Sequence, residues 1–159
     1  MSVTRISNSR RGLYFEEFEV GQKIFSAGRT VTETDLVMFS GLSGDFNQIH
    51  TDKEYSKNTQ YGQRVAHGIL GLSIASGLAV QTGFMEGTVI FFREISEWKF
   101  IKPIFIGDTI RVELVVLETK ALRKIGGGAV DIELQVKNQG DETVMKGIWK
   151  VLVSSRPEA

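Results

Sequence analysis

Asp45 and His50 are the two side chains of this sequence best placed to do acid–base chemistry together. They stand five residues apart in the stretch Ser43 to His50 (SGDFNQIH), which has the composition of a turn and no helical or strand period. Such a loop can curl and bring the carboxylate and the imidazole toward one small volume. A pair of this kind can hold one water molecule, with one partner removing its proton while the other supplies a proton to a substrate. The loop therefore predicts a site that activates water.

The backbone of Gly68 is the second candidate group, and it follows the other histidine of the chain, His67. Gly68 is expected at the N-terminus of a helix, where free N–H groups and the helix dipole favour developing negative charge. Having no side chain, it lets a carbonyl oxygen approach the backbone closely. These properties predict an oxyanion site for an enolate-like transition state. Gly68, His67 and Arg64 are the candidate substrate-binding residues; packing or hydrogen bonding at the helix start is the other interpretation of His67.

The element that must position these groups is the segment Val65 to Met85, which is 21 residues long and contains no Lys, Arg, Asp or Glu. It predicts a helix from Gly68 to Thr82, ended by Gly83. Because the segment is apolar nearly all round, the helix is expected to be enclosed on every side. A membrane span is the rival interpretation. The helix would be only about 22 Å long, however, against a hydrocarbon core of about 30 Å.

Before this helix, the pattern predicts one strand and two short helices. The strand runs from Lys23 to Val31. Thr32 is expected to cap a helix, with Asp35 completing an approximate capping box and the helix ending near Gly41. Asp52 is expected to cap one or two further turns.

After the helix, the sequence becomes rich in β-branched and aromatic residues, and apolar residues alternate with polar ones. This pattern predicts four strands in meander-like succession. Their expected ranges are Thr88 to Phe100, Thr109 to Thr119, Val130 to Val136 and Thr143 to Val153. A mostly antiparallel sheet packed on one long apolar helix is an α+β architecture. Residues 1–12 are expected to be a loose arm and residues 13–155 a single domain.

Composition excludes several classes of function. The 159 residues carry 19 basic and 19 acidic side chains, so no global field attracts nucleic acid or an anionic membrane, and phosphate groups need a local patch such as Arg64, Lys99 or Lys102. With no Cys there is no disulfide, thiolate nucleophile or Cys-ligated metal, and two histidines give a zinc site little support. No cofactor is expected. The first residues lack the apolar run of a secretory signal, so a cytoplasmic location is expected.

The segments around the candidate residues resemble one protein family. They are similar to the hydratase motif of MaoC-like proteins, the (R)-specific enoyl-CoA hydratases of hot-dog fold, in which an antiparallel sheet wraps around a long central helix. FEEFEVGQKI and FIKPIFIGDTIRV also resemble that family, so the resemblance covers nearly the whole chain. The segments that carry the central motif are SGDFNQIHTDKEY, RVAHGIL and IASG.

The resemblance implies a role for individual residues. In the family an Asp and a His activate water for syn addition to a trans-2-enoyl thioester, and these positions match Asp45 and His50. An Asn between them matches Asn47, the glycine facing the thioester carbonyl matches Gly68, and a helix serine matches Ser76. One departure is Gln48, where the family usually has Pro, which leaves the acid–base pair intact but affects the stiffness of the loop.

The implied function is that of a hydro-lyase that converts trans-2-enoyl-CoA to an (R)-3-hydroxyacyl-CoA or runs in reverse. A homodimer or a higher even oligomer is expected, because a single hot-dog unit leaves sheet edges unpaired. Two other functions stay open. One is a hot-dog acyl-CoA thioesterase. The other is a non-catalytic acyl-CoA-binding or assembly subunit, and the departure at Gln48 is the feature that leaves it open. Individually, Asp45 and Asn47 also suit Asx-turns, and Ser76 suits a bond back to the helix backbone.

Overall fold

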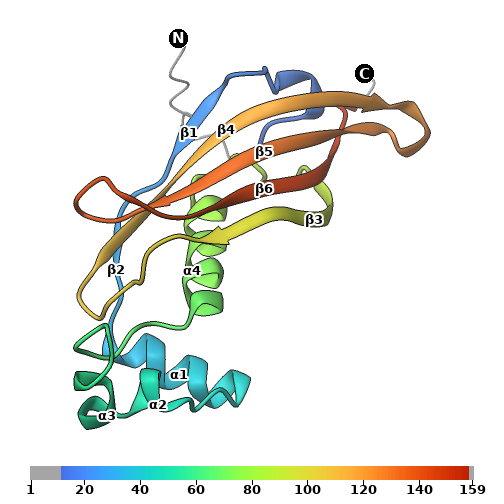
Figure 1. Cartoon of the computed structure of the whole chain (residues 1–159). Coiled ribbons are helices and arrows are strands. Elements are labelled where there is room, and N and C mark those ends of the chain that lie inside the picture. The colour runs from blue at the N-terminus through green and yellow to red at the C-terminus, as the bar shows by residue number, and fades with distance from the viewer. Residues whose placement is uncertain (1–11, 158–159) are drawn as a thin grey trace.

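An antiparallel sheet curves around one long helix in the computed structural model of the chain, which describes residues 12–157 (Figure 1). A group of short helices lies beyond the N-terminal end of that helix. The strands are β1 (Lys23–Phe25), β2 (Arg29–Thr30), β3 (Val89–Phe100), β4 (Thr109–Leu122), β5 (Gly127–Lys137) and β6 (Thr143–Ser154). The helices are α1 (Glu33–Ser43), α2 (Gln48–Thr51), α3 (Lys53–Lys57) and α4 (Gly68–Gln81), with 3₁₀ turns at Phe15–Glu17 and Arg123–Ile125. The expected α+β architecture is confirmed, and the expected arm lies outside the described residues except for Gly12.

The strand order in the sheet is β1-β4-β5-β6-β3, with β2 also paired to β4. On β4 the alternation predicted from the sequence is confirmed, since every second side chain from Thr109 to Val116 is fully buried. The buried set is Ile110, Val112, Leu114 and Val116. The strands do not form a simple meander, however, because β3 pairs with β6, and within residues 12–157 no strand pairs with the other side of β3.

The predicted first strand, Lys23 to Val31, is interrupted in its middle. Lys23 pairs with Val115, whereas Arg29 pairs with Ile110, so one extra residue separates the two registers. Between them the Ser26 hydroxyl accepts the N–H of Val112 at 2.9 Å, which replaces a backbone ladder bond. The prediction of one continuous strand was wrong because a side chain there competes for the ladder.

Helix α1 begins as predicted and ends later than predicted. The Thr32 side chain accepts the N–H of Asp35, and Asp35 accepts the N–H of Thr32, which is the expected capping box. The helix passes through Gly41 and ends at Ser43, and the next residue, Gly44, takes the left-handed conformation at φ 76°. Because α2 contains His50, only the residues from Gly44 to Asn47 form the loop that was expected to reach His50.

Helix α4 starts at Gly68 and is followed by Gly83 at φ 79°, as predicted. The expectation that it is enclosed on every side is wrong for the single chain. Its buried face, which includes Leu70, Ile74 and Leu78, packs against the sheet, while the opposite stripe is exposed. Ile69 and Val80 on that stripe are each 54% exposed. Among the described residues, no helix has both the length and the apolar character to cross a membrane.

Candidate active site

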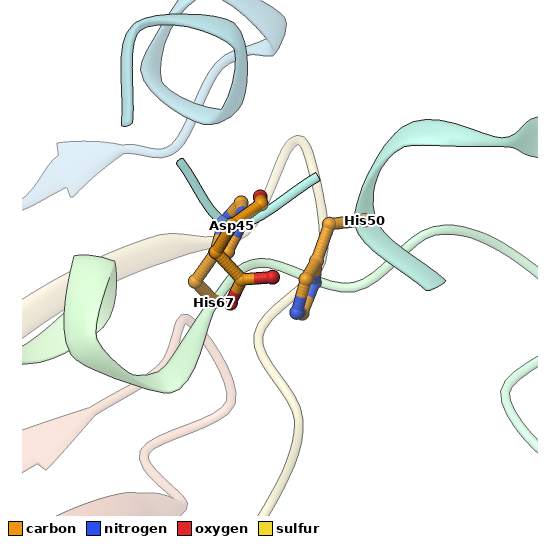
Figure 2. Close-up of side chains that lie close together, drawn as sticks. All are labelled: Asp45, His50 and His67. Carbon is orange, nitrogen blue, oxygen red and sulfur yellow. The ribbon is translucent and has the colours of Figure 1, made fainter. Parts of the chain in front are cut away.

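Asp45, His50 and His67 come together at the N-terminal end of α4. Asp45 lies in the loop after α1, His50 lies on α2, and His67 is the residue that precedes the first turn of α4. One donor atom from each, a carboxylate oxygen and two ring nitrogens, lies within 4.8 Å of the other two. Figure 2 shows the Asp45 carboxylate directed toward the side of the His50 ring. The two residues that the sequence predicted as an acid–base pair therefore share one small volume.

The loop that carries Asp45 is held by its own short polar side chains. The Asp45 carboxylate accepts the N–H of Asn47 at 3.2 Å, and the Asn47 side chain accepts the N–H of Ile49 at the start of α2. The Ser43 hydroxyl accepts the N–H of Asp45. These are the Asx-type turns expected of such residues, and they leave the second carboxylate oxygen of Asp45 without a partner in the described part of the chain.

The orientation of His50 decides which of its nitrogens can act on a proton. Its Nδ1 lies 2.7 Å from the backbone oxygen of Val65, and a carbonyl oxygen only accepts, so Nδ1 carries the hydrogen. In the neutral ring Nε2 then has a free lone pair. His50 is half-buried and Asp45 is exposed, so water can reach the space between them. Ligand atoms of Asp45 and His50 lie within 4.8 Å of each other, a separation that one bridging water molecule can span.

His67 packs face to face with His50. Their ring centroids lie 3.8 Å apart with planes inclined by 28°. Nearly parallel rings direct their in-plane lone pairs side by side, whereas a tetrahedral metal ion needs ligand lone pairs that converge on one point. The donor set Asp45, His50 and His67 is therefore composed like a metal site but is not oriented like one.

Gly68 opens α4, and its N–H makes no hydrogen bond within the described residues. It lies on the wall of an open pocket of about 470 Å³ that is lined mainly by apolar side chains. The Phe100 ring at the end of β3 covers the glycine, so that a Cβ at position 68 would stand 2.8 Å from the Phe100 Cε1 atom. The pocket reaches Gly68, Val65 and Ala66, but the side chains of Asp45 and His50 are not part of its wall.

Two of the other predicted site residues lie apart from this cluster. Ser76 faces a second hollow, of about 340 Å³, between α4 and β3, where Trp149 forms part of the lining. Arg64 forms a two-pronged ion pair with Glu33, in which Nη1 lies 2.8 Å from Oε1. Hydrogen bonds from Arg64 hold the pKa of Glu33 below its ordinary value, against the opposing effect of desolvation. In this structure Arg64 ties the start of α1 to the segment before α4.

Gln48 occupies a position that explains how the loop forms without the proline that the resemblance leads us to expect there. It is the first residue of α2, where proline is well accommodated and where the backbone N–H has no partner within the helix. The N–H of Gln48 makes no hydrogen bond in the described part of the chain. Asn47, which precedes it, has φ −53° and ψ 134°, which is outside the α region that a following proline disfavours. The loop conformation is therefore compatible with either residue.

Gln48→Pro is expected to raise the free energy of unfolding by about 0.4–1 kcal/mol, because it restricts the unfolded chain and breaks no hydrogen bond. Urea denaturation of the wild type, Gln48→Pro and Gln48→Ala measures this. Gln48→Ala is the matched control, since it removes the side chain without fixing φ. A Gln48→Pro variant less stable than Gln48→Ala would show that the loop does not have this backbone conformation.

Phe100 and the carbonyl of Val65 contribute to this region, and sequence reasoning missed both. The motif gave no signal for Phe100, because its contact with Gly68 joins the end of β3 to the start of α4. The Val65 carbonyl is a backbone group with no residue preference. Its role, which is to accept the hydrogen bond from Nδ1 of His50, depends only on where the backbone places it before α4.

Comparison with known proteins identifies relatives of this chain. Residues 17–138 match the family described as MaoC like domain. "Protein MaoC" of Klebsiella aerogenes is 41% identical over 101 residues, which are 64% of this chain but only 30% of that protein. The (R)-specific enoyl-CoA hydratase of Rhodospirillum rubrum is 32% identical over 65% of this chain and 69% of its own length. The 3-hydroxybutyryl-CoA dehydratase of Methylorubrum extorquens is 30% identical over 94% of this chain and 89% of its own length.

Solved structures of similar proteins also superpose on this chain. A monoamine oxidase regulatory protein from Archaeoglobus superposes with a TM-score of 0.86 at 39% identity, over 93% of this chain and 98% of that one. A Mycobacterium tuberculosis protein described as having a double hot-dog fold superposes with a TM-score of 0.83 at 18% identity, over 93% of this chain and 46% of that one. The second likeness shows the fold alone, which is the hot-dog fold expected from the sequence. Together with the match over residues 17–138, these comparisons show that the chain belongs to the MaoC-like domain family.

Proposed function

We propose that this protein is a hydro-lyase that adds water to trans-2-enoyl-CoA to give (R)-3-hydroxyacyl-CoA, or removes it in the reverse direction. The observation that carries the proposal is the pairing of an exposed carboxylate, Asp45, with a histidine whose Nε2 is left free by the bond from Nδ1 to Val65. Two relatives are named for hydration or dehydration of an acyl-CoA, which supports the same reaction.

In the proposed reaction a water molecule is held between Asp45 and His50. One of the two takes a proton from the water as its oxygen adds to C3 of the enoyl chain, and a proton from the pair is delivered to C2 on the same face. One water is thereby added across the double bond, and no redox partner is required. The Gly68 N–H supplies a hydrogen bond to the thioester oxygen, on which negative charge gathers as C3 is attacked.

Incubation with crotonyl-CoA tests the proposal, with the ultraviolet absorbance of the conjugated thioester and the release of free CoA followed in parallel. Hydration removes the enoyl absorbance without releasing CoA. Release of CoA would identify a thioesterase, and binding without either change would identify an acyl-CoA-binding or assembly subunit. Either of the last two results would overturn the proposal.

A homodimer belongs to this proposal, and β3 is the surface that we expect to form it. In the described part of the chain β3 pairs with β6 on one side only, and most of its residues are exposed, including Phe91 at 60% and Ile95 at 38%. A long apolar edge strand is an aggregation hazard in a monomer and a pairing site in a symmetric dimer. The exposed apolar stripe of α4 lies beside the same strand, with Ser76 and Phe92 lining one hollow.

Light scattering is expected to give the mass of a dimer or a higher even oligomer at micromolar concentration. Phe91→Glu is expected to shift the protein toward monomer by placing a charge in the interface. Val20→Glu is the control, since Val20 is 65% exposed and precedes β1 at the opposite edge of the sheet. A wild-type protein that stays monomeric would count against this assembly.

A further inference from the structure

His67 makes hydrogen bonds and ring contacts to several residues around the candidate acid–base pair. It is not part of the wall of the open pocket near Gly68. Its ring is 2% exposed. One face stacks on His50 and the ring of Phe39 on α1 approaches it at 4.9 Å between centroids. The ring therefore links α1, α2 and the start of α4, which are the elements that surround the site.

The hydrogen bonds of His67 are directed at the loop residue Asp45 and at Ser40 on α1, and not at its own helix. His67 precedes the first turn of α4, but its side chain makes no capping hydrogen bond there. Instead Nε2 lies 3.0 Å from the backbone oxygen of Asp45 and 3.4 Å from the hydroxyl of Ser40. Since a carbonyl oxygen only accepts, Nε2 carries the hydrogen and the shorter of the two contacts is its main bond.

The remaining nitrogen of the ring supports the same position of the hydrogen. Nδ1 of His67 is buried and has no hydrogen-bond partner among the described residues. A hydrogen on Nδ1 would be a buried N–H with no acceptor, which is costly. A hydrogen on Nε2 is instead bonded to the backbone oxygen of Asp45. His67 is therefore suited to hold its neighbours in place.

We propose that His67 is the positioning residue of the acid–base pair: its Nε2–H fixes the backbone of Asp45, and its ring face fixes the plane of the His50 imidazole. This inference rests on the proposed hydratase function. It replaces the expectation that His67 binds substrate with a role exerted through Asp45 and His50. A shift of about 1 Å in a reacting group can cost about 10²-fold in rate, so loss of this support should reduce turnover while substrate binding is retained.

Three variants separate the hydrogen bond from the ring. His67→Gln places an amide N–H near the position of Nε2, so it retains the bond to Asp45 but loses the stack. His67→Asn carries the same amide nearer to the position of Nδ1, too short to reach Asp45, and is the matched control. His67→Phe retains the stack but has no donor.

With crotonyl-CoA, His67→Asn and His67→Phe are expected to lower kcat by roughly 10- to 100-fold with KM changed less than about threefold, while His67→Gln recovers at least part of the loss. Thermal denaturation of each variant shows which are folded. A raised KM at unchanged kcat would mean that His67 binds substrate, and normal kcat in a folded His67→Asn would mean that it does not position the pair. Either result overturns the proposal.

Imidazole ¹⁵N NMR of the wild-type protein tests the same inference without turnover. We expect His67 to carry its hydrogen on Nε2 and His50 to carry its hydrogen on Nδ1. A His67 protonated at Nδ1 would overturn the proposal even if none of the variants folds. Because this measurement needs no activity, a failure to hydrate crotonyl-CoA would refute the proposed function while leaving the structural role of His67 to be decided by the spectrum.

Discussion

Asp45→Asn and His50→Ala are each expected to lower turnover of an enoyl-CoA by roughly 10²–10⁴-fold. Asp45→Asn removes the negative charge but keeps an oxygen that can accept the N–H of Asn47, so the loop should retain its shape. Asp45 is exposed, and its replacement should change stability little. The expected loss is therefore chemical and not structural.

His50→Ala needs a matched control, because His50 also bonds to the Val65 carbonyl and stacks on His67. His50→Asn places an amide N–H near the position of Nδ1 and so can keep the bond to Val65, but it has no group at the position of Nε2. If Nε2 acts on the water, both variants should lose activity to a similar extent.

The double variant tests whether the two residues work as a unit. Because Asp45 and His50 hold the same water, their losses of turnover should not add. The double variant Asp45→Asn/His50→Ala should turn over only slightly more slowly than the less active of the two single variants. Steady-state kinetics with crotonyl-CoA, together with thermal denaturation of each protein, provides the measurement. Near-normal activity in either folded single variant would remove the pair from the mechanism.

Gly68→Pro is expected to lower turnover by about 10²–10³-fold, the usual effect of losing one oxyanion donor. Proline deletes the N–H of residue 68 but suits the first turn of a helix. His67, the preceding residue, has φ −58° and ψ 136°, which is outside the α region that a following proline disfavours. The Gly68 N–H makes no hydrogen bond among the described residues, so its removal breaks no existing contact.

Gly68→Ala is the control that makes this experiment decisive. Both substitutions add a Cβ that would stand 2.8 Å from the Phe100 ring, so both require Phe100 to move aside. Phe100 is 53% exposed, and its ring has room to move. Alanine should weaken binding and turnover through this crowding, whereas proline should add the loss of the donor. A folded Gly68→Pro variant that equals or exceeds Gly68→Ala in turnover would exclude the oxyanion role of this amide.

The sequence predicted the parts of the fold that depend on local periodicity. Alternation along β4 and the turn at Gly83 depend on neighbouring residues alone, and both were predicted correctly. The break in the first strand and the pairing of β3 with β6 depend on partners far along the chain. The exposed stripe of α4 was missed for a different reason: an apolar helix surface looks the same in a sequence whether the same chain or another copy covers it.

The candidate site was predictable in its chemistry but not in its arrangement. Asp45 and His50 lie in one short loop and helix, so their proximity is local. The stacking of His67 on His50 and the cover of Phe100 over Gly68 join segments that only the folded chain brings together. The pairing of Arg64 with Glu33 is of the same kind, since 31 positions separate the two residues.

The residues between β2 and α4 contribute few side chains to the hydrophobic core, which affects how far sequences of this family can vary in that segment. From residues 31–67 the buried core takes only Val31, Leu36, Val65 and Ala66 as apolar members, while the described strands and α4 supply most of the rest. Polar links such as Arg64 to Glu33 attach this segment to the remainder. Natural selection can therefore change loop length and side chains there with little cost in folding free energy, so that new substrates and new reactions arise on an unaltered sheet.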